Sequence, residues 1–146
     1  DWNCAFLMGS LSALSAGLQN SGVGTVVAEM ILKVFGQNPS TFLITTVLFF
    51  TIAILTQLMS NTATILLFMP IAISVAESIG VSVYPVAMIV TLAGAASYAT
   101  PFAAPQNMLA VGWTNYKFMD FVKVGIPMVL LTYLVVICLI PIVMPF

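Results

Sequence analysis

Charged residues interrupt this chain at only seven positions, and they leave four long stretches that carry no charge. These stretches are residues 2–28, 34–76, 78–116 and 124–146. An apolar run of about 18 residues without charges is long enough to cross the hydrocarbon core of a bilayer as a helix. Each of the four stretches exceeds that length. The pattern therefore predicts an all-α integral membrane protein.

Residues 1–40 are predicted to form a transmembrane helix followed by an interfacial helix. The apolar run at 2–18 is rich in Gly, Ala and Ser, which let helices approach closely in lipid. Residues 23–35 mix apolar runs with Glu29 and Lys33, which lie four positions apart on one helical face. A helix of that composition suits the membrane surface better than its core.

Residues 41–80 contain a polar interruption where a simple transmembrane hairpin would have a charged or Gly-rich loop. Apolar segments at 41–57 and 63–76 flank the tripeptide Ser60-Asn61-Thr62, with no charge, Pro or Gly between them. Two arrangements fit this pattern: two full spans joined by a short polar loop, or a re-entrant hairpin whose tip lies within the membrane. We favour the hairpin. Its tip must then be buried in protein or line a wet cavity.

Residues 81–112 are predicted to form a broken transmembrane helix. The helix starts at Tyr84-Pro85, continues to Ala99 and resumes from Met108 to Val111. Two prolines, Pro101 and Pro105, fall in the gap and free backbone carbonyls from their helical partners. A simple proline kink used for packing is the alternative.

Residues 113–146 are predicted to form an interfacial loop and a last transmembrane helix. The stretch before position 124 holds aromatic and charged side chains, a combination typical of the membrane surface. The helix is predicted from about Val124 to Pro141.

Composition narrows the function further. Hydrophobic residues make up 62% of the chain and charged residues 5%, against about 45–50% and 25% in typical soluble domains. The net charge is −1 with no basic cluster, so a nucleic-acid partner is not expected. The absence of His excludes a Ser–His hydrolase within the chain and disfavours zinc or iron sites. We therefore expect the protein not to be an enzyme.

The two interruptions are polar but uncharged, and this points to transport. Hydroxyl, amide and free carbonyl oxygens are suitable ligands for a hard monovalent cation, while helix N-termini attract anions. Paired broken helices near the middle of the membrane are the way many secondary transporters build a cation site beside a substrate site. Ser60-Asn61-Thr62 taken alone is equally typical of a helix cap in a tight turn.

Three motifs resemble the divalent anion/sodium symporter family. Thr56-Gln57-Leu58-Met59-Ser60-Asn61-Thr62-Ala63-Thr64 is similar to the second Ser-Asn-Thr hairpin of that family. Ala103-Ala104-Pro105-Gln106-Asn107, followed by Val111-Gly112, is similar to its Ala-Thr-Pro-Pro-Asn loop. Phe121-Val122-Lys123-Val124-Gly125-Ile126-Pro127 is similar to the start of its last helix. The resemblance covers the C-terminal inverted repeat.

The resemblance implies a multi-pass elevator-type transporter in the cell (inner) membrane, usually a homodimer, that couples sodium to the uptake of a dicarboxylate, citrate or sulfate. The N-terminal repeat of the same transporter would be the partner of this chain. Carried over by position, the implied sodium ligands are Thr56, Ser60, Asn61 and the Ala103 carbonyl, and the implied substrate contacts are Asn61, Thr62 and Pro105.

The chain departs from the family pattern at three positions. Ala104 stands in place of a Thr, Gln106 in place of a Pro, and Gln57 where an acid is frequent. The alternatives to sodium symport are a proton-coupled or arsenite/antiport-type ion transporter of the same architecture, and a non-transporting membrane scaffold subunit.

Overall fold

The computed structural model describes residues 40–113 and 116–145, together with a few positions nearer the start of the chain. Those positions are Phe6, Gly9, Ser10, Ala13, Gly17, Asn20–Gly22 and Val26. Most of the predicted interfacial helix at 23–35 and most of the predicted transmembrane helix at 2–18 lie outside the described residues.

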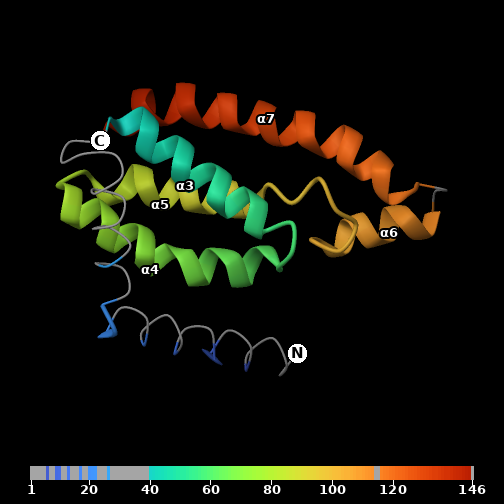
Figure 1. The fold of residues 1–146 in the computed structure, drawn as a ribbon, viewed down its shortest axis with the longest axis horizontal. Helices are drawn as coiled ribbons and strands as arrows, with labels where there is room; N and C mark the ends of the chain where they lie inside the picture. The colour runs from blue at the N-terminus through green and yellow to red at the C-terminus, as the bar shows by residue number, and fades with distance from the viewer. Residues whose placement is uncertain are drawn as a thin grey trace.

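Every regular element in the described part of the chain is a helix, which agrees with the all-α prediction. In chain order they are α3 (Thr41–Leu55), α4 (Asn61–Ile79), α5 (Val83–Ala95), α6 (Pro105–Trp113) and α7 (Phe118–Val143). Helices α3, α4, α5 and α7 lie side by side, and α6 lies beyond them beneath the start of α7 (Figure 1).

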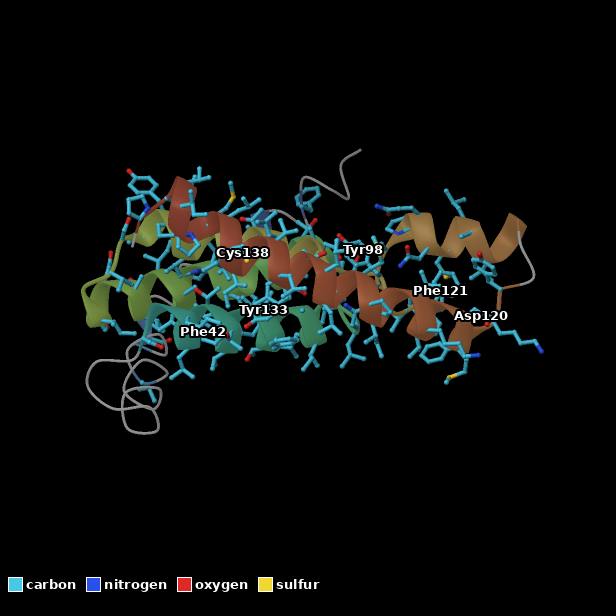
Figure 2. All side chains as sticks on the ribbon, turned by 90° about the horizontal axis from the view of Figure 1, so that it is seen from above. Phe42, Tyr98, Asp120, Phe121, Tyr133 and Cys138 are labelled. Carbon is cyan, nitrogen blue, oxygen red and sulfur yellow. The ribbon has the colours of Figure 1, made fainter. Side chains whose placement is uncertain are left out.

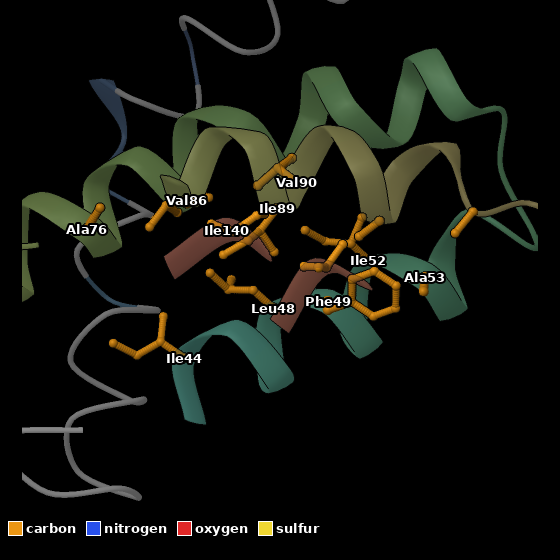
Figure 3. Packing of buried hydrophobic residues seen from close by; sticks show 14 residues of the cluster. Ile44, Leu48, Phe49, Ile52, Ala53, Ala76, Val86, Ile89, Val90 and Ile140 are labelled. Atoms are coloured by element: carbon orange, nitrogen blue, oxygen red, sulfur yellow. The ribbon is translucent and has the colours of Figure 1, made fainter. Parts of the chain in front are cut away.

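Helix α5 lies at the centre of this arrangement and packs against α3, α4 and α7. Val86, Ile89, Val90 and Ala93 are fully buried, and their spacing of three and four places them on one face of the helix. Phe49 and Ile52 of α3 meet this face in the apolar core shown in Figure 3. The core is therefore built by α5 and completed by the helices around it.

Helices α3 and α4 begin at serine caps, which explains their starts. The Ser40 Oγ accepts a hydrogen bond from the Leu43 N–H at 3.3 Å, and the Ser60 Oγ accepts one from the Ala63 N–H at 3.3 Å. Each cap satisfies an N–H group that has no partner within its helix. Helix α4 ends at Gly80, whose φ of 77° is the left-handed conformation that glycine adopts without a Cβ penalty.

Helix α5 ends at Ala95, earlier than the predicted end at Ala99, and an unwound segment of residues 96–104 follows it. Helix α6 begins at Pro105 instead of Met108. Proline is well tolerated in the first turn of a helix because its missing N–H would have no partner there. Pro105, one of the two prolines in the interruption, therefore starts the next helix.

Helix α7 begins at Phe118 rather than near Val124, because Asp120 caps it. The Asp120 carboxylate accepts a hydrogen bond from the Lys117 N–H at 2.9 Å, and a negative charge is favourable at a helix N-terminus. Asp120 and Lys123, which the sequence assigned to a loop, thus belong to the first turns of the helix, and Lys117 is its N-cap residue.

Two of the described helices, α4 and α7, are long and apolar enough to cross a membrane. Large side chains on α7 such as Val124, Leu131 and Leu134 are more than half exposed. A continuous apolar outer surface of this kind suits contact with lipid or with further helices.

A pair of hydroxyl groups joins α3 to α7 across the apolar core. The Thr46 Oγ1 donates to the Phe42 carbonyl at 2.7 Å and lies 2.8 Å from the Tyr133 Oη. Since the threonine hydroxyl has a single hydrogen, Tyr133 is the donor in the second bond. The Tyr133 ring also packs against Phe49 and Phe50 at centroid distances of 5.5 and 4.9 Å.

Candidate functional site

The turn between α3 and α4 meets the unwound segment between α5 and α6. We call residues 56–60 the hairpin tip and residues 96–104 the unwound segment. The two are about forty positions apart in sequence, and hydrogen bonds between them bring them together. Both polar interruptions predicted from the sequence therefore meet at one place.

Three oxygen atoms gather where the hairpin tip reaches the end of α5. The Thr56 Oγ1 lies 2.7 Å from the Gly94 carbonyl oxygen and 3.0 Å from the Asn61 Oδ1. Thr56 is fully buried, and Asn61, the first residue of α4, is half-buried. One hydroxyl hydrogen is available to these three oxygens. The cluster is therefore rich in acceptor lone pairs and poor in donors.

Gln57 links the hairpin tip to the unwound segment through its whole side-chain amide. Its Nε2 donates to the Ala53 carbonyl at 2.9 Å and to the Ala96 carbonyl at 2.8 Å, and its Oε1 accepts from the Ala99 N–H at 2.9 Å. The Thr100 hydroxyl also donates to the Gln57 backbone carbonyl at 2.8 Å. Backbone groups that lost their helical partners are thereby satisfied.

Asn107 supports the unwound segment from the other side. This residue lies in the first turn of α6, and its Nδ2 donates to the Ser97 and Thr100 carbonyls at 2.7 and 2.8 Å. Asn107 thus bonds Thr100, which in turn bonds Gln57. Two hydrogen bonds in series connect the start of α6 with the hairpin tip.

Close packing against α7 fixes the unwound segment in place. A Cβ added at Gly125 would lie 2.4 Å from the Ala99 Cα and 2.5 Å from the Tyr98 carbonyl carbon, both of them backbone atoms. Only a glycine allows this approach. Figure 2 shows Tyr98 partway along α7, with Asp120 and Phe121 at one end of that helix.

The electrostatics of this site come from dipoles. The charged side chains in the described part of the chain are Glu77 at the end of α4 and Lys117, Asp120 and Lys123 at the start of α7, and none of them joins the hydrogen bonds of the hairpin tip or of the unwound segment given above. The hairpin tip contributes the N-terminus of α4, with its partial positive charge. Carbonyl oxygens from the end of α5 contribute partial negative charge.

Sequence comparison identifies the family. The pattern of the citrate transporter family matches residues 1–146, the whole chain. The chain belongs to the citrate transporter family. This agrees with the resemblance to divalent anion/sodium symporters, and it places the chain in a family of transporters and not of enzymes.

Family members of several organisms match nearly the whole chain. The uncharacterized transporter YfbS of Escherichia coli is 36% identical over 145 residues, which is 99% of this chain and 24% of that protein. The Na(+)/citrate cotransporter of Rattus norvegicus is 32% identical over 127 residues, 87% of this chain and 22% of that protein. Solute carrier family 13 member 1 of Homo sapiens is 32% identical over 125 residues, which is 86% of this chain and 21% of that protein. The chain thus spans about a quarter of the length of these relatives.

The structure brings together some of the residues that the resemblance assigned to sodium and substrate. Thr56 and Asn61 are in contact through their side-chain oxygens. Ser60 is next to Asn61, but its Oγ is used as the cap of α4. Thr62 is exposed on the first turn of α4.

The other assigned residues lie on the unwound segment side. Ala103 is buried, and Pro105 is exposed at the start of α6. The hydrogen bonds of the described residues do not join either of them to Thr56 or Asn61.

Sequence reasoning did not assign a role to Gly94. Its carbonyl is free for Thr56 because the residue four positions later, Tyr98, lies in the unwound segment and makes no helical bond to it. The signal available in the sequence was Pro101, which ends a helix some residues before itself. That signal marks a set of freed carbonyls without saying which one meets the hairpin tip.

Proposed function

We propose that this chain is the C-terminal inverted repeat of an elevator-type secondary transporter that couples sodium to the uptake of a small divalent anion. The observation that carries the proposal is the cluster of uncharged oxygens from Thr56, Asn61 and Gly94 where two interrupted helices meet. Family membership supports it, as does its similarity to the Na(+)/citrate cotransporter of Rattus norvegicus.

The oxygen atoms of this cluster are suitable ligands for sodium. A hard cation prefers oxygen ligands, and hydroxyl, amide and backbone carbonyl oxygens are all present here. Transporters commonly use carbonyls of unwound backbone and helix C-terminal ends for such ions. Thr56, Asn61 and Gly94 would hold the ion, with Ser60 and the Ala103 carbonyl as further ligands supplied by the family resemblance.

The start of α4 suits the anionic substrate. The N–H groups of Asn61 and Thr62 belong to the first turn, where helical N–H groups have no intrahelical partner, and the helix dipole favours negative charge there. The Thr62 hydroxyl, exposed on the same turn, would donate to a carboxylate or sulfate oxygen. Pro105, at the start of α6, would border the proposed substrate site.

The short α3 and the position of the hairpin tip along α7 support a re-entrant hairpin, which we place in the cell (inner) membrane. Helix α7 has 26 residues, about 39 Å at 1.5 Å per residue, whereas α3 has 15 residues, about 22 Å. Gln57 bonds Ala99, which lies against Gly125 of α7. Gly125 is seven residues from the start of α7, so the tip would lie about 10 Å inside that end of the helix.

Uptake by the complete transporter in proteoliposomes tests the proposal. Radiolabelled succinate, citrate and sulfate are supplied with an inward sodium gradient or with choline in place of sodium. We expect sodium-dependent uptake of at least one of these anions. The N-terminal repeat would complete the pocket, and the assembly would be a homodimer.

The same assay separates the alternatives. Uptake that is unchanged in choline would favour proton coupling or an arsenite/antiport-type transporter. Function that survives both Ser60→Ala and Asn61→Ala would favour a membrane scaffold subunit.

A further inference from the structure

The Gln57 side chain makes three hydrogen bonds, two of them to the unwound segment, yet its amide contributes no atom to the oxygen cluster. Its Nε2 bonds the Ala53 carbonyl on α3 and the Ala96 carbonyl just after α5, while its Oε1 accepts from the Ala99 N–H. Both amide hydrogens and the amide oxygen are thus engaged. Such a set requires a neutral group that is donor and acceptor at once.

These bonds fix the two halves of the oxygen cluster against each other. Thr56, on one half, directly precedes Gln57 in sequence, and Gly94, on the other half, lies two positions before Ala96. Without the Gln57 amide, the 2.7 Å contact between the Thr56 Oγ1 and the Gly94 carbonyl would be the remaining hydrogen bond between the tip and the end of α5 among the described residues.

The surroundings strengthen the bridge. A partly open groove of about 340 Å³ lies beside Gln57, and its other lining residues, such as Phe50, Ile54 and Leu130, are apolar. Hydrogen bonds in apolar surroundings are stronger than in water, and an unpaired polar group there costs more. Loss of the amide would leave two carbonyls and one N–H to find new partners.

We propose that Gln57 is a positioning residue for the cation: it holds the hairpin tip and the unwound segment at the separation that sodium binding needs. This inference rests on the proposed function, because it assigns Gln57 to the sodium site proposed there. The residue acts through Thr56, Asn61 and Gly94 and does not itself ligate the ion. Its effect should therefore appear in sodium affinity.

The variant Gln57→Met tests this with little change in side-chain length and no added charge. Two readouts on the complete transporter are used: the sodium concentration that gives half of the sodium-induced rise in thermal midpoint in detergent, and the sodium concentration for half-maximal anion uptake in proteoliposomes. We expect both concentrations to rise about five- to tenfold, because the three hydrogen bonds of the amide are lost and part of their combined free energy acts on the ion site. The first readout needs no transport.

A second variant and a matched control keep the test sharp. Thr100→Val removes the hydroxyl that donates to the Gln57 carbonyl, and it should raise both concentrations about two- to threefold, because one bond of the bridge is lost. Thr46→Val removes an equally short bond between α3 and α7, away from the site. It should lower the thermal midpoint and the amount of folded transporter while leaving the sodium concentrations unchanged.

The outcomes separate the two proposals. A wild-type transporter without any sodium response in either readout would overturn the proposed function and this inference together. The inference alone would be overturned if the wild type responds to sodium and the two sodium concentrations of Gln57→Met lie within about twofold of the wild-type values. The inference would also be wrong if Thr46→Val shifted the sodium concentrations as much as Gln57→Met.

Discussion

Replacing Gly125 with alanine should push α7 away from the unwound segment. The added Cβ would lie 2.4 Å from the Ala99 Cα, 2.5 Å from the Ala99 nitrogen and 2.5 Å from the Tyr98 carbonyl carbon. Ordinary contacts of a Cβ begin at 3.4 Å, so the two segments must separate by about 1 Å. All three atoms are backbone, which cannot rotate away as a side chain does.

The free-energy change has two opposing parts. Overpacking by one methyl group costs about 1–3 kcal/mol, while alanine gains about 0.5–1 kcal/mol over glycine in a helix interior. Because the neighbouring backbone cannot yield, the overpacking term should dominate. We expect a net destabilisation of about 1–2 kcal/mol.

The displacement should also reach the sodium site. The Ala99 N–H bonds the Gln57 Oε1 at 2.9 Å, and a shift of about 1 Å would exceed the range in which that bond persists. Gly125→Ala should therefore lower the thermal midpoint in detergent and raise the sodium concentration for half-maximal uptake. Val124→Ala is the matched control, since that neighbouring side chain is 63% exposed. Wild-type values of both quantities in Gly125→Ala would refute the reasoning.

Four further predictions concern single side chains. Asn61→Ala should abolish sodium-coupled uptake while surface expression persists, and Thr62→Ala should weaken anion affinity by about 1–2 kcal/mol for one lost hydrogen bond; normal uptake kinetics in both variants would count against these sites. Tyr133→Phe removes the donor to Thr46 and should cost about 1 kcal/mol of stability, seen as a lower thermal midpoint with unchanged sodium affinity; an unchanged midpoint would contradict that value. Asp120→Ala removes the carboxylate that accepts the hydrogen bond of the Lys117 N–H at the start of α7 and should cost about 0.5–1.5 kcal/mol, measured the same way; a variant as stable as wild type would show that this bond is dispensable.

The sequence located the interruptions but not their contacts. Ser60 at a helix start and Pro101 with Pro105 in a helix break are local signals, because caps and prolines act on the backbone within a few residues. The bond from Thr56 to the Gly94 carbonyl joins residues 38 positions apart, and no local pattern specifies such a pairing.

At the start of α7 the sequence was misleading about local structure as well. Lys117, Asp120 and Lys123 look like a solvated loop, because charge and aromatic residues are typical of membrane surfaces. The hydrogen bond from the Lys117 N–H to the Asp120 carboxylate instead starts a helix there. A cap is recognised by geometry, and the same residues occur in loops.

Much of the meeting point between the hairpin tip and the unwound segment is built from main-chain atoms. Four carbonyls of this region accept hydrogen bonds from side chains of other segments. Thr56 and Gln57 of the hairpin tip donate to the carbonyls of Gly94 and Ala96, and Asn107 of α6 donates to those of Ser97 and Thr100. Alanine scanning leaves these acceptors in place, so a scan of residues 94–99 would report mainly on packing. The chemistry of the Gly94 carbonyl becomes visible only when the peptide link between Gly94 and Ala95 is replaced by an ester, which weakens that oxygen as an acceptor and ligand without altering any side chain.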